Sequence, residues 1–157
     1  MTSHDHRTPT PTPTPTPAPA PAPAPAPQRT TVTGLFPPPG YAHAAVVEAG
    51  TRLAFMAGSV PLDPDGRLVG EGDVVRQTEQ VIANLDEALR AVGSALPQVV
   101  ASTVYVVGDE PATLRAAWQV VRASGLSAGP HTSTLLGTAC LGYPGQLVEI
   151  TATAVVP

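Results

Sequence analysis

The chain offers few residues whose type and surroundings suggest chemistry, and Glu149 is the first of them. It lies between Val148 and Ile150 in an alternating segment, and a carboxylate with apolar neighbours is suited to act as a general base. The alternative is a solvent-facing position in the same segment, which needs no function. Ser133 adds a hydroxyl group, but the sequence shows no triad of nucleophile, base and acid around it.

Two histidines stand inside the body of the chain, at His43 and His131. Either one could bind an acidic group when protonated, although an unperturbed imidazole is mostly neutral near pH 7. We expect His131 to begin a strand near the mouth of a cleft. His43 is equally suited to two roles, as a hydrogen-bonded histidine at an interface or as a catalytic base.

Charge and composition argue against several classes of partner. The formal net charge is −4 with only eight Lys and Arg residues, which are not clustered, so we expect no nucleic-acid partner. No apolar run reaches the ~18 residues of a membrane span, and the first residues lack the apolar stretch of a secretory signal. The single cysteine, Cys140, fits a reducing compartment and a small buried position. We therefore predict a cytoplasmic protein without a membrane partner.

The first 29 residues have the composition of a tail. From Pro9 to Pro27 a proline occupies every second position, first in Thr-Pro and then in Ala-Pro repeats. Because proline lacks an amide donor and restricts the residue before it, this run favours an extended polyproline-II conformation. It would act as a spacer, as a ligand for a proline-binding partner, or as a solvated tail without a catalytic role. His4 and His6 flank Asp5 near its start, but we predict no metal site and no cofactor.

Residues 30–157 have the pattern of one α+β domain. Asp73 is a suitable N-cap for a helix whose apolar residues recur at helical spacing until Gly93 ends it. Pro111 opens a second helix, which covers residues 112–123. Of the expected strands, the first two pair as an antiparallel hairpin. The strands cover residues 44–50, 52–58, 67–69, 99–107, 132–139 and 147–156.

The expected sheet leaves one face uncovered. Both helices are predicted on the same side, whereas the strand over residues 99–107 is almost continuously apolar and needs cover on both faces. A large exposed apolar face usually marks an interface, and closed symmetric assemblies are the usual result. The periodicity predicts an oligomer but does not decide between a dimer and a trimer.

Five short segments combine into a recognisable pattern. They are GYAHA at 40–44, AGSVPLD at 57–63, QTEQVIANL at 77–85, VVASTVYV at 99–106 and VEITA at 148–152. In this order and with this spacing, they resemble the signatures of the Rid (YjgF/UK114) family over nearly the whole domain and none of the tail. The resemblance implies a chorismate-mutase-like fold with one mixed sheet and two helices on one face. It also implies a homotrimer with three clefts between its subunits.

The resemblance further implies which residues line a cleft. In the family's imine deaminases an arginine binds the carboxylate of the substrate, and this sequence has Thr132 at that position, which can form no bidentate ion pair. Glu149 matches the glutamate that positions or activates water, and Tyr41 matches the tyrosine of the cleft. The further substrate-binding candidates are His131, Ser133, Gly58, Ser59 and His43.

The expected function is therefore that of a family member without the arginine. It would hydrolyse a reactive imine or enamine, a small molecule other than a 2-imino acid, to a ketone and ammonia. Glu149 would activate water, Tyr41 with Thr132 or Ser133 would orient the substrate, and a histidine would shuttle protons. The alternative is a non-catalytic trimer that binds a small metabolite, or a scaffold tethered through its proline-rich arm. The ligand preference of the pocket helps to discriminate between these functions. A pocket without arginine should favour neutral or weakly acidic ligands.

Overall fold

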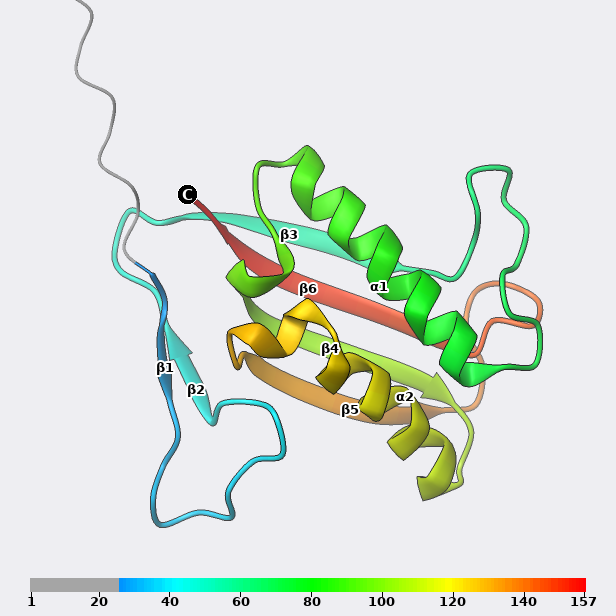
Figure 1. The fold of residues 1–157 in the computed structure, drawn as a ribbon, viewed down its shortest axis with the longest axis horizontal. Coiled ribbons are helices and arrows are strands. Elements are labelled where there is room, and N and C mark those ends of the chain that lie inside the picture. The colour runs from blue at the N-terminus through cyan, green and yellow to red at the C-terminus, as the bar shows by residue number, and fades with distance from the viewer. Residues whose placement is uncertain (1–25) are drawn as a thin grey trace, which may run out of the picture.

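The computed structural model describes residues 26–157 (Figure 1). Most of the predicted tail and both N-terminal histidines lie outside the described residues. The first strand begins at Gln28, two residues before the predicted start of the domain at residue 30. The helices are α1 (Val74–Ala91) and α2 (Pro111–Ala123), with 3-10 turns η1 (Leu96–Gln98) and η2 (Gly125–Ala128). The strands are β1 (Gln28–Thr30), β2 (Ala44–Val46), β3 (Arg52–Ser59), β4 (Val99–Val107), β5 (Thr132–Thr138) and β6 (Val148–Val156).

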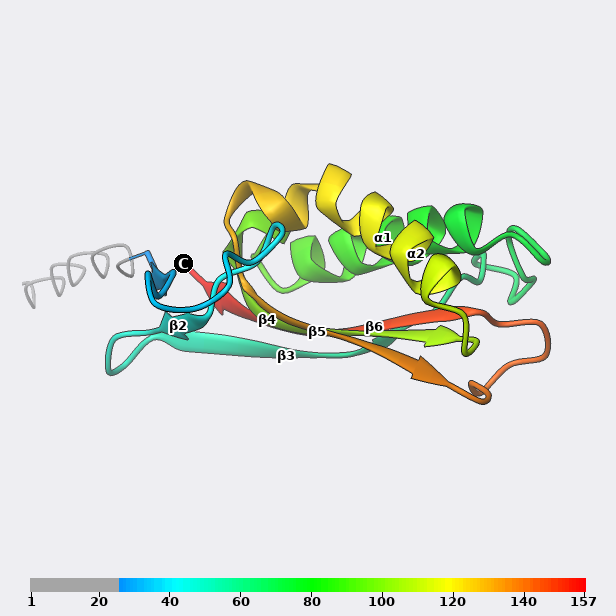
Figure 2. The ribbon, with the colours of Figure 1, turned by 90° about the horizontal axis from the view of Figure 1, so that it is seen from below.

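Four of the strands form one mixed sheet in the order β3-β6-β4-β5. Strand β6 runs antiparallel to both β3 and β4, whereas β4 and β5 are parallel. Strands β1 and β2 form a separate two-stranded sheet. Figure 2 shows α1 and α2 together on one side of the four-stranded sheet, whose other side carries no helix from residues 26–157. This confirms the predicted mixed sheet with two helices on one face.

The core lies between the two helices and the covered face of the sheet. Val104 of β4 and Ile150 of β6 meet Leu85 and Leu89 of α1 and Val121 of α2, and each of these side chains is fully buried. Burial of a large aliphatic side chain contributes about 1.5–3 kcal/mol. Since successive residues of a strand point to opposite faces, this packing also determines which side chains of β4 and β6 reach the open face.

Helix α1 begins and ends as the sequence predicts. The Asp73 carboxylate accepts hydrogen bonds from the amides of Val75 and Arg76, at 3.0 and 3.1 Å. Gly93 follows the helix with a φ of 79°, a conformation that glycine adopts without strain. The strand over 99–107 and the helix after Pro111 are also confirmed.

The predicted hairpin between residues 44–50 and 52–58 is wrong. Strand β2 pairs with β1, with Ala44 opposite Thr30, whereas β3 pairs with β6. An alternating strand pattern shows that a segment is extended but does not identify its partner. The partner of β2 includes residues that the sequence analysis placed in the tail.

Two smaller expectations also differ from the structure. The expected strand at 67–69 is only a single bridge between Leu68 and Leu62. Cys140 is exposed rather than buried, because it lies beyond the end of β5 in the loop that leads to β6.

Candidate functional site

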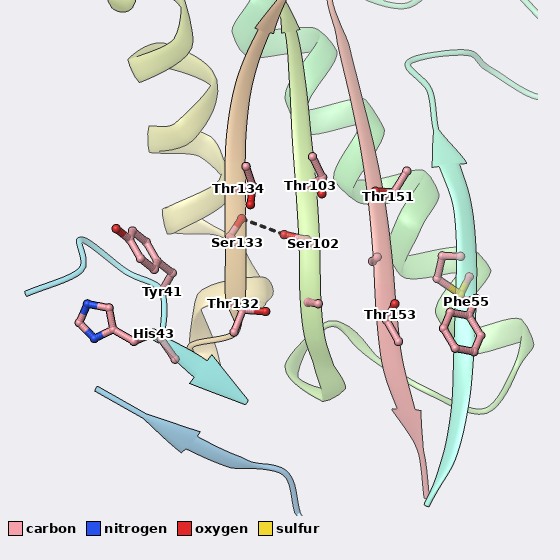
Figure 3. Close-up of a pocket in the computed structure, with 14 residues that line it drawn as sticks. Tyr41, His43, Phe55, Ser102, Thr103, Thr132, Ser133, Thr134, Thr151 and Thr153 are labelled. Atoms are coloured by element: carbon pink, nitrogen blue, oxygen red, sulfur yellow. Dashed lines mark hydrogen bonds between the residues drawn. The ribbon is translucent and has the colours of Figure 1, made fainter. Parts of the chain in front are cut away.

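The open face of the sheet carries a cluster of threonines. In the register of the sheet, Thr103 of β4 is opposite both Thr134 of β5 and Thr151 of β6. Residues two apart in a strand share a face, so the next threonines along β5 and β6 join the same cluster, as Figure 3 shows. The cluster consists of Thr103, Thr132, Thr134, Thr151 and Thr153.

These threonines line a pocket with a volume of about 480 Å³. Tyr41 and His43 border it on the side of β5, and Phe55 and Met56 of β3 border it on the opposite side (Figure 3). The volume lies within the range of small-molecule sites. No Lys, Arg, Asp or Glu is among the described residues that line the pocket. The pocket therefore offers hydroxyl groups and aromatic surface, but no cation to pair with a carboxylate.

Thr132 is the residue at the position where the resemblance expects an arginine. Its hydroxyl donates a hydrogen bond to the carbonyl oxygen of Val100 at 3.0 Å. A threonine hydroxyl has one proton and two lone pairs. With that proton used inside the fold, Thr132 presents only an acceptor to a ligand.

His43 borders the pocket but is also part of the fold. Its Nδ1 accepts a hydrogen bond from the amide of Val32 at 2.9 Å, so the ring proton is on Nε2, which lies 3.2 Å from the carbonyl oxygen of Phe36. Both ring nitrogens thus hold the loop that follows β1. The ring of Tyr41 packs edge to face against His43 and against Trp118 of α2.

Glu149 lies elsewhere on the open face, opposite Tyr105 of β4. Its carboxylate occupies the space over Gly58 of β3, where an added Cβ would come within 2.0 Å of Oε1. The side-chain amide of Gln146 donates a hydrogen bond to Glu149 Oε2 at 3.1 Å. Gln146 is itself buried, and its amide orientation is fixed because its oxygen accepts from the amide of Tyr143. The carboxylate is therefore held in one place by its neighbours.

The structure thus divides the predicted site residues between two places in one chain. Thr132 is level with Thr153 across the sheet, since both are opposite Ala101. Glu149 lies four residues along β6 from Thr153, or roughly 13 Å, and two strands away from β5, or about 10 Å. Tyr41, His43, Thr132 and Ser133 come together in the threonine-lined pocket, and Glu149 and Gly58 come together at the other end of the face. One copy of the chain does not bring both groups to the same ligand.

His131 lies on the opposite face from Thr132, whereas Ser133 also lines the pocket and is linked to His131 through Ser102. His131 is fully buried beneath the helices, where Nδ1 donates to the carbonyl oxygen of Leu126 at 3.1 Å. Its Nε2 therefore accepts from the hydroxyl of Ser102 at 2.7 Å, and Ser102 in turn accepts from Ser133 at 2.9 Å. Burial lowers the pKa of His131 below 6.5, partly offset by the bond to Leu126. His131 is thus a neutral residue of the core, not a residue of the cleft mouth.

Buried amides hold the loops around Glu149. Gln77 of α1 donates to the carbonyl oxygens of Gly70 and Gly145 and accepts from the amide of Leu147, at 2.7–3.1 Å. Asn84 of α1 donates to the carbonyl oxygens of Val60 and Leu62, both at 2.8 Å. The QTEQVIANL segment therefore positions the chain on both sides of the Gly58–Glu149 contact.

Ser59 ends β3 beside this contact. The pairing of β3 with β6 is irregular between Met56 and Ser59, so Ser59 is opposite Ile150 and does not line the threonine pocket. Sequence reasoning missed several residues that the structure places in the two groups. They are Phe55, Thr103, Thr151, Thr153 and Gln146. The Thr-x-Thr spacing in β6 was a usable signal, because such residues share a face.

Neither α1 nor α2 has the length and hydropathy to cross a membrane, and residues 26–157 contain no other helix that does. In the same part of the chain, no three His, Cys, Asp or Glu side chains are placed to hold a metal ion.

Comparison with known proteins agrees with the geometry. The family model described as endoribonuclease L-PSP matches residues 36–156. A Rid-family protein of unknown function from Yersinia pestis, YyfB, is 36% identical, with a TM-score of 0.75 over 82% of this chain and 98% of its own. A putative endoribonuclease from Thermotoga maritima is 27% identical, with a TM-score of 0.59 over 81% of this chain and 91% of its own.

Curated relatives match over a shorter stretch. Protein DfrA of Myxococcus xanthus is 39% identical over 71 residues, which are 44% of this chain and 53% of DfrA. The chain spans about half the length of the curated relatives it matches. With the family model covering most of the domain and the Yersinia structure aligned almost end to end, this chain belongs to the Rid family.

Proposed function

We propose that this protein hydrolyses a reactive imine or enamine to a ketone and ammonia, and that its substrate lacks the carboxylate of 2-imino acids. The observation that supports this most strongly is the position of Glu149. Its Oε1 lies over Gly58, and its Oε2 accepts a hydrogen bond from the side-chain amide of Gln146. Oε1 is not bonded to that amide. A carboxylate held in this way is suited to take a proton from an attacking water molecule.

The reaction requires only water. Its oxygen adds to the carbon of the C=N bond while Glu149 accepts one of its protons. Glu149 passes this proton to the nitrogen, which gives a carbinolamine. The hydroxyl proton of the carbinolamine then moves to the nitrogen through Glu149 as well, the C–N bond breaks as the C=O bond forms, and ammonia leaves. Glu149 returns to its carboxylate form at the end of the reaction. The hydrolysis therefore consumes only water and the substrate.

The threonine-lined pocket supports a substrate without negative charge. An Arg–carboxylate pair is charge-assisted and bidentate, and the lining of this pocket has no residue that could form one. Thr132 presents an acceptor, which suits an N–H or O–H group of the substrate. Tyr41 adds an aromatic wall at the same end of the pocket.

The distance between the two groups of residues supports a cleft shared by two copies. Phe55 is 79% exposed and Leu136 is 44% exposed on the open face, which is the type of surface that a further copy covers. We propose a homotrimer in which the threonine-lined pocket of one copy meets the Glu149 end of the next. This assembly is also what the resemblance to the family implies.

Some proteins similar to this chain are named as endoribonucleases, and this name applies to those proteins. An RNA substrate would need a basic surface to neutralise phosphates. This chain has a net charge of −4, and its candidate pocket has no lysine or arginine. These features support a small neutral substrate instead.

A substitution at position 132 tests the substrate preference. We expect Thr132→Arg to raise kcat/KM for 2-iminobutanoate by roughly 10- to 100-fold, because a hydrogen bond to a charged group contributes about 1.5–3 kcal/mol. The matched control is Thr138→Arg, on the same strand and the same face but outside the pocket lining.

Three outcomes would contradict the proposal. One is a Thr132→Arg variant that assembles like the wild type yet remains inert on 2-iminobutanoate. Another is a wild-type protein that already prefers 2-iminobutanoate to a carboxylate-free imine. The third is saturable binding of imines without turnover, which would indicate a non-catalytic metabolite-binding protein.

A further inference from the structure

A second pocket lies at the outer edge of β5, between that strand and α2. It has a volume of about 360 Å³, and Pro39, Tyr41, Trp118 and Leu135 supply most of its apolar wall. The rings of Tyr41 and Trp118 stand edge to face, with centroids 6.2 Å apart and planes at 69°. The indole N–H of Trp118 donates to the carbonyl oxygen of Pro39 at 3.2 Å, which fixes the loop against the helix. We refer to this pocket as the Tyr41–Trp118 groove.

The chemistry of the groove fits an extended proline-rich segment. Grooves lined by aromatic rings bind polyproline-II segments, because the rings pack against the pyrrolidine side chains of a backbone that is already extended. Tyr41 and Thr134 have hydroxyl groups that can donate to the free carbonyls of such a segment. The Ser133 hydroxyl donates its proton to Ser102, so its oxygen is left to accept an amide N–H. An alternating X-Pro repeat retains one amide N–H at every second residue.

We propose that the Tyr41–Trp118 groove binds an X-Pro repeat and that its occupant is the chain's own Thr-Pro repeat, at residues 9–17. The sequence supplies this ligand in the form that the groove suits, with five prolines at alternate positions and no charged residue among them. The groove lining is also uncharged, so charge repulsion does not oppose the contact.

The geometry of β1 decides which part of the tail can reach the groove. Gln28 is opposite Val46, five residues after Tyr41, so the root of the tail lies within roughly 20 Å of the groove. The chain approaches His43 as it runs from Gln28 to Thr30, so the tail enters β1 from the side away from the groove. A ten-residue Ala-Pro repeat such as residues 18–27 would span about 31 Å in the polyproline-II form. It can therefore turn back and cover this distance as a tether, which leaves the Thr-Pro repeat at the groove.

Covalent attachment makes a weak site sufficient. The effective concentration of a tethered segment is highest when the linker length matches the span, and it reaches the mM range for short flexible linkers. A groove with an intrinsic Kd of about 1 mM would then be roughly half occupied by the tail of its own chain.

The only tryptophan of the chain gives a direct test, since Trp118 forms a wall of the groove. In the full-length protein, serine replaces each proline of the Thr-Pro repeat. We expect the indole ¹H–¹⁵N signal of Trp118 to shift and its quenching by acrylamide to rise by roughly twofold, as for a groove that was about half filled. The replaced residues are Pro9, Pro11, Pro13, Pro15 and Pro17.

The matched control keeps the prolines and changes the residues between them. In this variant serine replaces Thr10, Thr12, Thr14 and Thr16, and we expect the Trp118 signal to stay at its wild-type position. Titration of the proline variant with a synthetic Thr-Pro octapeptide should return the Trp118 signal towards the wild-type position in a saturable manner. Coincident Trp118 signals in the wild type and the proline variant would overturn the proposal, and so would an equal shift in the control.

Discussion

A side chain at position 58 would occupy the space that the Glu149 carboxylate fills. An added Cβ would stand 2.0 Å from Oε1 and 2.6 Å from Cδ of Glu149. Gly58 has no positive φ, so its backbone conformation does not itself call for glycine. The requirement at position 58 is therefore room for the carboxylate, and it links a glycine of β3 directly to the proposed general base.

Gly58→Ala should consequently behave like a substitution of Glu149 itself. The methyl group forces the carboxylate away from its place, and loss of a positioned general base costs about 10²–10⁴-fold in rate. We expect such a loss of imine hydrolysis, with little change in the free energy of unfolding, because the half-buried Glu149 side chain can rotate outward. Kinetics and urea unfolding of the purified variant measure both effects.

Gly34→Ala is the control for this experiment, since an added Cβ at Gly34 meets no atom within 4 Å. Full activity in Gly58→Ala, at wild-type stability, would show that the position of Glu149 over Gly58 does not matter for catalysis.

At the scale of elements, strand β5 shows how far the sequence could lead. Its bounds were predicted to within one residue, as 132–139 against the observed Thr132–Thr138. Which face of the sheet each side chain of β5 points to could not be predicted without the register between β5 and β4. The register places Thr132 on the open face, and it brings the Ser133 hydroxyl to Ser102, which is bonded to the buried His131, although Ser133 still lines the pocket. Three adjacent residues that looked like one site therefore serve two different purposes.

The residues that contact Glu149 could not be predicted from the sequence, for a similar reason. The sequence identified Glu149 and Gly58 as candidates but not their contact, which depends on the pairing of β3 with β6 and on its irregularity after Met56. Gln146 lies in a loop, where no periodicity indicates the direction of a side chain. Sheet pairing and loop conformation are tertiary properties, whereas the strands and helices themselves follow from local pattern.

The buried His131 joins β5 to β4 and η2, and it should make stability depend on pH. Its pKa is lowered in the folded protein by burial, relative to 6.5 in the unfolded chain. Between these two pKa values the unfolded state binds more protons than the folded state. The contribution of His131 is therefore complete above pH 6.5 and is lost as the pH falls below it, by up to about 1.4 kcal/mol per pH unit.

Urea unfolding between pH 5 and 7.5 measures this dependence. We expect His131→Asn to be less stable than the wild type at pH 7.5 and to have a flatter profile below pH 6.5. His43→Asn serves as the control, because His43 is only half-buried and holds a surface loop. Parallel profiles for the wild type and His131→Asn would refute the assignment of the slope to His131.

At the scale of the whole molecule, the two groups of site residues make a specific demand on assembly. The threonine-lined pocket and Glu149 lie at different ends of one open face. Phe55, which lines the pocket, is 79% exposed in a single copy. If a cleft takes its pocket from one copy and its carboxylate from the next, two defective copies can complement each other.

Mixing two inactive variants tests this arrangement. Glu149→Ala removes the base and Thr103→Trp fills the pocket, so neither variant alone should hydrolyse an imine. After dissociation and random reassembly of a one-to-one mixture, about a quarter of the clefts combine an intact pocket with an intact base. We expect activity to return to that fraction of the wild-type value. Absence of recovery, with subunit exchange verified by mass spectrometry, would contradict a cleft that takes its pocket from one copy and its carboxylate from the next.

The most direct measurement of the proposed chemistry is ammonia release from a freshly generated, carboxylate-free ketimine. The wild type and Glu149→Gln are compared at equal concentration, with spontaneous hydrolysis subtracted and oligomeric state checked for both. We expect the wild type to exceed the background and Glu149→Gln to lose about 10²–10⁴-fold of that rate. A correctly assembled wild type with no rate above background, or a Glu149→Gln variant as fast as the wild type, would contradict a Glu149-dependent imine hydrolase.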